Sequence, residues 1–475
     1  MCVVGLGLAL LLANLWVPHE RKPLLGYAAA LGLGAILVYS FFLTQPATEE
    51  ARYAFERMFA LDDLALFFKR FFLLAAILVL IISVEFSDRI ETGIGEYYAL
   101  LLFALTGMLF ASSANHFAVL FVSLELITIT FYVLTSFQRG RAASLEAGVK
   151  YLVIGGLSTA FTVFGIALVY GMSGTLEFGT LAGEAAQLGS NKIFLFGLLL
   201  IMVGLGFKIA AFPFQIWAPD VYQGAPTPTT AFLAVGSKAA GFVLLLRVLF
   251  IAVPAITAQW TDLLIFISAI TILYGNLCAI PQRNVKRLMG YSSIAHAGYL
   301  LLGVAALSSD GRSALLYYLS GYLFSVLAAF MVITLVLRHL SGEDISGLAG
   351  LHQRSPLLAA TMTLAMVSLA GIPPLAGFFG KFLLLKAVIA QGAINPGYYC
   401  LAFTAIAGVV ISLYYYFGVI RAIYWSPAAP DLNPIAISTP IRCSIYACIA
   451  GIFYLGIFPG PMLNWAAQAV KVLSP

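Results

Sequence analysis

Residues 203–241 read VGLGFKIAAFPFQIWAPDVYQGAPTPTTAFLAVGSKAAG, and this stretch decides how the rest of the chain is interpreted. It places Lys208 in an apolar helix that we expect to break near Pro213, and it carries Lys238 in the next apolar run. A lysine at membrane depth costs roughly 2.5–3.5 kcal/mol even on a lenient insertion scale. A proline there leaves backbone groups unpaired, which lipid cannot satisfy. Such costs side by side indicate a functional region inside a membrane protein.

The composition supports a membrane location. Of the 475 residues, 62% are hydrophobic and only 9% are charged, whereas soluble domains carry about 25% charged residues. Apolar runs of about 20 residues, the length needed to cross a bilayer, recur from end to end. The net charge of +5 is small and scattered, so nucleic acid is not an expected partner. The first run lacks a basic flank before it, so we interpret it as a retained span and not as a signal peptide.

The pattern of apolar runs predicts an all-α polytopic membrane protein with about fourteen transmembrane helices. Two of these helices are expected to be broken, the seventh near Pro213 and the twelfth at residues 371–377. Three short loops, at 17–23, 137–146 and 281–287, are rich in lysine and arginine, which predicts that both termini lie on the outer face. The predicted spans are 1–16, 24–43, 66–84, 97–112, 116–136, 147–171, 193–217, 228–250, 261–280, 286–307, 313–338, 356–391, 398–425 and 440–458.

A repeat relates the two interrupted spans, which lie five spans apart and carry Lys208 and Lys381. Two five-helix units fit this spacing, and because five is odd, the second unit must be inverted relative to the first. The sequence distance from Glu125 to Lys208 is nearly the distance from His296 to Lys381. We therefore divide the chain into N-terminal helices (1–96), a first repeat (97–250), a second inverted repeat (251–425) and a C-terminal helix (426–475).

Six titratable residues inside the predicted spans, or at a span end, are candidates for carrying protons: Glu125, Lys208, Lys238, His296, Lys381 and Lys150. Desolvation disfavours the charged form of such a group, so a lysine at depth can load and release a proton near neutral pH. Each residue also has a structural alternative. Glu125 could be a neutral or structurally paired acid, the lysines could extend to an interface, and His296 could be a satisfied core residue. The role of Lys386, which could reach the outer interface, stays open.

No cofactor motif accompanies these residues. The chain has no GxGxxG after a strand, no Walker A loop, no haem motif and no cysteine set for an iron–sulfur cluster or zinc. The histidines outside the spans are scattered. We therefore expect no cofactor and no metal in this chain, and any redox or nucleotide energy must come from partner subunits.

Three motifs carry a family resemblance: FKIAAFPFQIWAPDVYQGAPTPTTAFLAVGSKAAGF (207–242), NVKRLMGYSSIAHAGYLL (284–301) and SLAGIPPLAGFFGKF (368–382). They resemble the antiporter-like subunits of respiratory complex I over spans four to thirteen. The resemblance implies two inverted five-helix repeats, a half-channel in each, and a proton path through the residues named above. It further implies neighbouring antiporter-like and small membrane subunits, with NADH, FMN, iron–sulfur clusters and quinone bound elsewhere in the complex.

Within this family the chain resembles the N-type subunit. The M-type usually has glutamate at the position of Lys381, and the L-type continues into a long lateral helix beyond the position of Pro475. One departure from the family concerns the N-terminus. Family members usually have a fuller first span, so we expect that the start at Met1 could be late.

The resulting hypothesis is redox-driven proton translocation in a bacterial inner membrane by one subunit of an NADH:quinone oxidoreductase. Two alternatives stay open. One is a subunit of a multi-subunit sodium/proton antiporter with the same repeat, and the other is a stand-alone solute transporter with broken helices.

Overall fold

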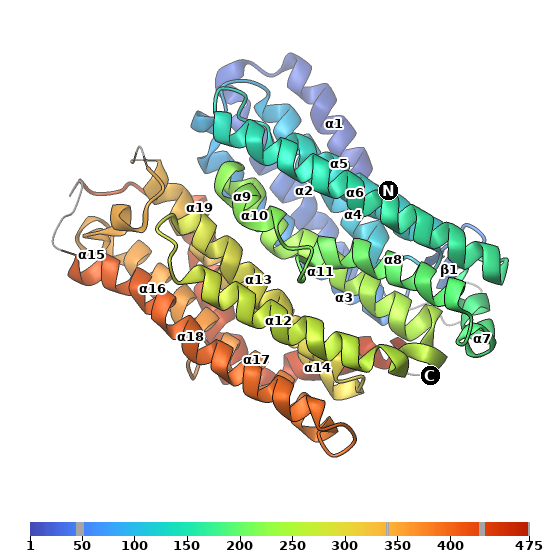
Figure 1. The fold of residues 1–475 in the computed structure, drawn as a ribbon. Coiled ribbons are helices and arrows are strands. Elements are labelled where there is room, and N and C mark those ends of the chain that lie inside the picture. The colour runs from blue at the N-terminus through green and yellow to red at the C-terminus, as the bar shows by residue number, and fades with distance from the viewer. Residues whose placement is uncertain (44–51, 339, 341, 427–432, 474–475) are drawn as a thin grey trace.

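The computed structural model describes residues 1–43, 52–338, 340, 342–426 and 433–473, and within them the fold is almost entirely helical (Figure 1). The N-terminal part contains α1 (Cys2–Trp16), α2 (Pro23–Phe42), α3 (Asp63–Glu85), α4 (Ile94–Ser112), α5 (Phe117–Thr135), α6 (Ala142–Ser173) and α7 (Phe178–Leu188). A short hairpin of β1 (Tyr53–Ala54) and β2 (Phe59–Ala60) precedes α3.

The remaining helices follow in chain order. The middle of the chain contains α8 (Lys192–Ile209), α9 (Trp217–Gly224), α10 (Thr227–Phe232), α11 (Lys238–Arg247), α12 (Thr261–Ala279), α13 (Val285–Ala305) and α14 (Ser309–Leu337). The C-terminal part contains α15 (Leu351–Arg354), α16 (Pro356–Ala370), α17 (Ala376–Gln391), α18 (Gly397–Trp425), α19 (Thr439–Ile457) and α20 (Pro459–Ala469).

Twelve helices of the described chain are long and apolar enough to cross a membrane, which confirms an integral multi-pass protein. The continuous segment Thr227–Ala252, which contains α10 and α11, counts as one of them. The other two predicted spans correspond to α1 and to the α16–α17 pair. Helices α1 and α16 are apolar but shorter than the twelve. Helices α7 and α20 were not predicted, since their short amphipathic sequences do not stand out beside the long apolar runs.

The centre of the bundle consists of the segment Thr227–Ala252, α13 and α14, each 94% buried over its apolar window. In Figure 1, α10 and α11 lie between the blue-to-teal N-terminal helices and the yellow-to-red C-terminal helices. Helix α6 lies at the periphery, where only 28% of its window is buried. A buried helix with lysine or histidine on it must satisfy those groups within the protein. The centre of the bundle is therefore where the polar residues find their partners.

Both expected helix breaks are present. Helix α8 ends at Ile209, Ala210 takes a left-handed conformation with φ of 60°, and the chain resumes helical structure at Trp217. Pro213 lies inside this interruption, where its missing N–H costs no helical hydrogen bond. The second break separates α16 from α17 and contains Pro373. The first break begins earlier than Pro213 itself, because the left-handed residue ends α8 three positions before the proline.

Candidate functional site

Four of the six predicted residues are buried inside the bundle: Lys208 is 3% exposed, Lys238 3%, His296 2% and Lys381 4%. They come from α8, α11, α13 and α17, four helices separated by long stretches of sequence. A buried cation requires hydrogen-bond acceptors to offset its lost hydration. The partners of each ammonium or imidazole group therefore define the site.

Lys208 occupies the last turn of α8, where the carbonyl end of the helix favours a positive charge. Its ammonium donates to Thr128 Oγ1 of α5 at 2.8 Å. Glu125, one turn earlier on α5, is half-buried and accepts a hydrogen bond from Thr159 Oγ1 of α6 at 2.7 Å. Each group is thus held by a threonine hydroxyl, and the described side chains show no direct ion pair between Lys208 and Glu125.

Lys238 opens α11 directly after a π-helical turn, a local irregularity that is frequent at functional sites. Its ammonium donates to the carbonyl and to the hydroxyl of Ser293 on α13, and it lies 5.5 Å from the centre of the Tyr322 ring. The lysine is also close to α8. A Cβ atom on Gly241, one turn beyond Lys238, would lie 3.3 Å from Lys208 Cβ. The two lysine-bearing helices therefore pack directly against each other at this depth.

His296 lies in the middle of α13 and uses both ring nitrogens. Its Nδ1 lies 2.5 Å from Tyr318 Oη, and its Nε2 lies 3.0 Å from Tyr416 Oη. Tyr416 Oη is in turn 2.5 Å from Ser292 Oγ. A neutral imidazole donates through one nitrogen and accepts through the other, and a hydroxyl group can do both. This arrangement can pass a proton through the ring by exchanging tautomers.

Lys381 lies in the second turn of α17 and reaches back across the helix break. Its ammonium donates to the carbonyl oxygens of Leu369, at 2.8 Å, and Ala370, at 3.1 Å, which are the last residues of α16. Those carbonyls have no partner within their own helix and carry the negative end of its dipole. The ammonium also lies 4.7 Å from the centre of the Tyr299 ring. Both helix breaks therefore place a lysine at the C-terminal end of a half-helix.

One face of α13 connects these groups. Ser293, His296 and Tyr299 are spaced three residues apart, so they lie on the same side of the helix. Ser293 binds Lys238, Tyr299 lies against Lys381, and His296 sits between them with its ring centre 6.1 Å from that of Tyr299. The structure thus brings Lys238, His296 and Lys381 into one row of polar and aromatic side chains along α13.

Lys150 lies apart from this row. It is 41% exposed on its side chain and forms ion pairs with Glu146 at 2.6 Å and with Asp220 of α9 at 2.7 Å. Asp220 also accepts from Arg287 at the start of α13 at 2.5 Å. Lys150 therefore belongs to a charged cluster that joins α6, α9 and α13 near one end of the bundle. Within the part of the chain that the structure describes, these contacts of Lys150 do not reach the other five predicted residues.

Sequence reasoning missed the hydroxyl groups that complete the site, namely Thr128, Thr159, Ser293, Tyr318, Tyr322 and Tyr416. Helical spacing offers a signal for two of them, because Thr128 follows Glu125 by one turn and Ser293 precedes His296 by one turn. The tyrosines carry no such signal, since they come from α14 and α18 and reach His296 only through packing. Within the described ranges, no group of three or more His, Cys, Asp or Glu residues could hold a metal ion.

Comparison with known proteins gives one consistent family. The family described as "NADH:quinone oxidoreductase/Mrp antiporter, TM" matches residues 114–412. The chain is 42% identical over 474 residues to NADH-quinone oxidoreductase subunit N of Trichlorobacter lovleyi, covering 98% of this chain and 95% of that protein. It is 41% identical over 465 residues to the protein of the same name from Moorella thermoacetica, covering 98% and 96% of the two chains.

Solved structures agree with this result. A chain of respiratory complex I from Thermus thermophilus, determined with bound aureothin, has a TM-score of 0.80 and 33% identity, covering 98% of this chain and 99% of that one. A chain of the Mrp complex from Dietzia sp. DQ12-45-1b has a TM-score of 0.82 at 20% identity, covering 99% and 97%. The second likeness, at this low identity, concerns the fold alone.

Proposed function

The chain belongs to the family of membrane subunits shared by NADH:quinone oxidoreductases and Mrp antiporters, and we propose that it is the N-type, proton-translocating subunit of a respiratory complex I membrane arm. Electron transfer from NADH to quinone takes place in partner subunits, which hold NADH, FMN, the iron–sulfur clusters and the quinone. This chain contributes a path for protons. Its neighbours in the membrane arm are other antiporter-like subunits and small membrane subunits, within a bacterial inner membrane and with both termini outside.

The observation that supports this function best is the row of partners along α13. Lys238, His296 and Lys381 are each buried, and the two lysines contact the face of α13 that carries His296. Buried amines and an imidazole can take up and release protons without any bound cofactor. A solute transporter would need a cavity shaped to a substrate, whereas His296 is buried against the rings of Tyr318 and Tyr322.

In the proposed path, a proton enters from the cytoplasmic side towards Lys208 and Lys238. It passes His296 and leaves through Lys381. Residues 97–250 and 251–425 form the two inverted repeats, each with one broken helix. Glu125 acts as the switch that couples this subunit to its neighbour. Thr128 is the intermediate contact for that switch, because Lys208 binds this threonine while Glu125 lies one turn away.

Co-purification tests the function directly. We expect an affinity tag on this chain, in its native membrane, to isolate a complex that oxidises NADH, reduces a quinone and pumps protons after reconstitution into liposomes. Isolation with antiporter subunits alone, free of any NADH-oxidising activity, would instead support the sodium/proton antiporter, which has the likeness to the Mrp chain in its favour. Transport by the purified single chain would support the stand-alone solute transporter.

Gly371 provides a prediction about the second helix break. Its φ of 88° lies in the left-handed region, and a Cβ atom added there would lie 2.9 Å from Lys381 Cδ. We expect Gly371→Ala to destabilise the protein by about 1–2 kcal/mol through the backbone alone. It should also lower proton pumping, because the Lys381 side chain must move away from the Leu369 and Ala370 carbonyls.

The measurement is the temperature at which the purified complex loses half of its pumping activity. Gly418→Ala is the matched control, since that glycine lies inside α18 and a Cβ atom there meets no neighbour within 4 Å. Equal half-inactivation temperatures and equal pumping for the two variants would show that the conformation of Gly371 does not matter.

A further inference from the structure

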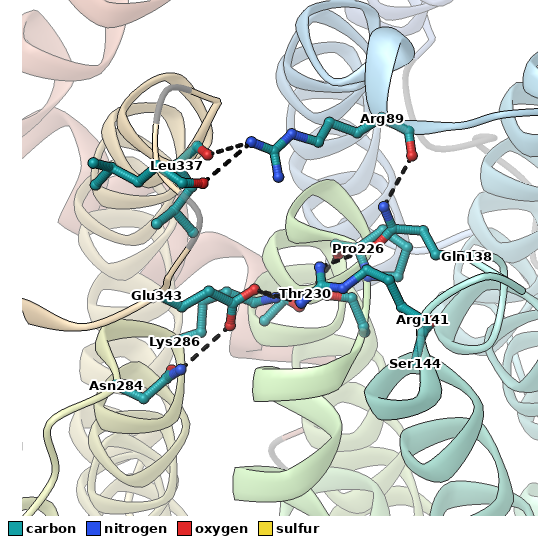
Figure 2. Close-up of polar contacts among 12 residues, drawn as sticks. Arg89, Gln138, Arg141, Ser144, Pro226, Thr230, Asn284, Lys286, Leu337 and Glu343 are labelled. Atoms are coloured by element: carbon teal, nitrogen blue, oxygen red, sulfur yellow. Dashed lines mark hydrogen bonds and ion pairs between the residues drawn. The ribbon is translucent and has the colours of Figure 1, made fainter. Parts of the chain in front are cut away.

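A chain of polar contacts at one end of the bundle joins three parts of the protein that are far apart in sequence (Figure 2). At its centre is Glu343, in the connection between α14 and α15. Its carboxylate accepts hydrogen bonds from Arg141, which precedes α6, at 3.0 Å, and from Lys286 in the first turn of α13, at 3.3 Å. Asn284 contributes a third contact at 3.3 Å. One carboxylate thus receives donors from the first repeat and from the second.

The backbone around Glu343 is fixed as well. The Val285 amide donates to the Glu343 carbonyl at 2.9 Å, and the Ile345 amide donates to the Arg283 carbonyl at 2.7 Å. These two bonds hold the connection against the start of α13 as a short antiparallel bridge. The bridge therefore fixes the backbone at Glu343, and the side chain extends from it to Arg141 and Lys286.

The contacts extend from Arg141 towards the N-terminal helices. Arg141 donates to Gln138 Oε1 at 3.3 Å, and the Gln138 amide donates to the Arg89 carbonyl at 2.9 Å. Arg89, between α3 and α4, donates in turn to the Leu337 carbonyl at the end of α14 at 2.6 Å. The chain of contacts therefore runs from Glu343 past the N-terminal helices to the end of α14, as Figure 2 shows.

Lys286 connects Glu343 to the segment that follows the first helix break. Its side chain is 1% exposed, and its ammonium also donates to the Ala225 carbonyl at 2.8 Å. Ala225 lies at the bend between α9 and α10. Helix α9 follows the first helix break, and α10 begins the segment that carries Lys238. Glu343 is the carboxylate that balances this buried cation, and a buried cation that loses its counter-charge is strongly destabilised.

The charge state of Glu343 suits this role. Partial burial alone would raise the pKa of its carboxyl group, but the Lys286 ammonium and the Arg141 guanidinium outweigh that effect, and the pKa lies below its ordinary value. The group is therefore ionised at neutral pH. Because this pKa is lowered in the folded protein, the ion pairs of Glu343 stabilise the fold fully at a pH above the unfolded-state pKa, near 4.5. This stabilisation is lost as the pH falls through the folded-state pKa of Glu343.

We propose that Glu343 is a positioning residue for proton translocation, which holds Lys286 against the Ala225 carbonyl and so fixes the α9–α10 bend relative to the second repeat. The inference rests on the proposed function, because the bend leads directly into the helix of Lys238. Glu343 does not carry the proton in this scheme. It sets the placement of α10 and α11, and with it the contact between Lys238 and Ser293 on α13.

The test compares Glu343→Gln and Glu343→Asp in the purified complex. The glutamine variant loses the negative charge, and we expect hydrogen exchange of the backbone amides in residues 222–230 to rise about tenfold, as for a lost hydrogen bond to a charged group. We also expect fewer protons pumped per NADH oxidised. The aspartate variant restores the charge and should bring both values back towards the wild type. Glu91→Gln is the matched control, an exposed carboxylate at the α3–α4 connection.

Exchange at 222–230 that is unchanged in Glu343→Gln overturns the proposal, whatever happens to pumping. A rise in exchange with an unchanged ratio of protons to NADH also overturns it, because the contact is then structural only. If Glu343→Gln does not assemble, Arg141→Gln removes one donor to the same carboxylate from a partly exposed site and is measured in the same way. Failure of the proposed function would appear separately, as a wild-type complex that oxidises NADH without pumping.

Discussion

Replacing Lys381 with methionine is expected to reduce proton pumping by the assembled complex by at least about tenfold, because a positioned proton carrier contributes a factor of roughly 100 to 10,000. Methionine retains most of the side-chain volume but cannot accept a proton or donate to the Leu369 and Ala370 carbonyls. Those two carbonyls would be left without their donor at the helix break. The measurement is the initial rate of NADH-driven acidification in membrane vesicles, normalised to the amount of assembled complex.

Lys386→Met is the matched control for Lys381. It lies on the same helix, α17, carries the same charge and is exposed. We expect this variant to pump at close to the wild-type rate, since an exposed lysine loses little when its charge is removed. Similar pumping by the two variants would show that Lys381 is no more important for proton translocation than the exposed Lys386.

Lys208 gives the second large effect, and two variants separate its possible roles. Lys208→Met removes the charge and the hydrogen bond to Thr128, so pumping should fall by at least about tenfold. Lys208→Arg keeps a positive charge in the last turn of α8, but a guanidinium group does not release its proton in proteins. If Lys208 carries protons, the arginine variant should fail to pump as well.

The arginine variant therefore distinguishes a proton carrier from a fixed charge. Pumping at the wild-type rate by Lys208→Arg would mean that only the charge at the end of α8 is needed. Lys192→Met is the control, because Lys192 opens the same helix and is exposed. Assembly of each variant is verified by the NADH-oxidising activity that co-purifies with it.

Much of the fold follows from local properties of the sequence. Long apolar runs predict membrane helices, because a segment in lipid must pair its own backbone N–H and C=O groups and a helix does so. The structure shows these runs as helices. Proline and glycine near Pro213 and at 371–377 predict the breaks for the same reason. The inverted relation of the two five-helix units stays a prediction, since it concerns the symmetry of the bundle and not any single helix.

The site was predicted in part. A lysine inside an apolar run is conspicuous, so Lys208, Lys238 and Lys381 could be identified from hydropathy alone, and each is buried. Lys286 was counted only as a basic residue of the loop 281–287, because it stands at the first position of the predicted span 286–307 beside other basic residues. Its burial depends on Glu343 and Ala225, which approach it from separate connections.

The sequence by itself determined that this is a multi-span membrane protein with two broken helices and with amines at membrane depth, because insertion cost and helix breaking act on residues close together in the chain. Only the tertiary structure decided which partners those amines have. Whether Lys238 meets Ser293, or Lys208 meets Thr128 instead of Glu125, depends on how each helix is rotated and on which helix packs beside it. That rotation is set by close packing of side chains from distant parts of the sequence, which no local pattern records.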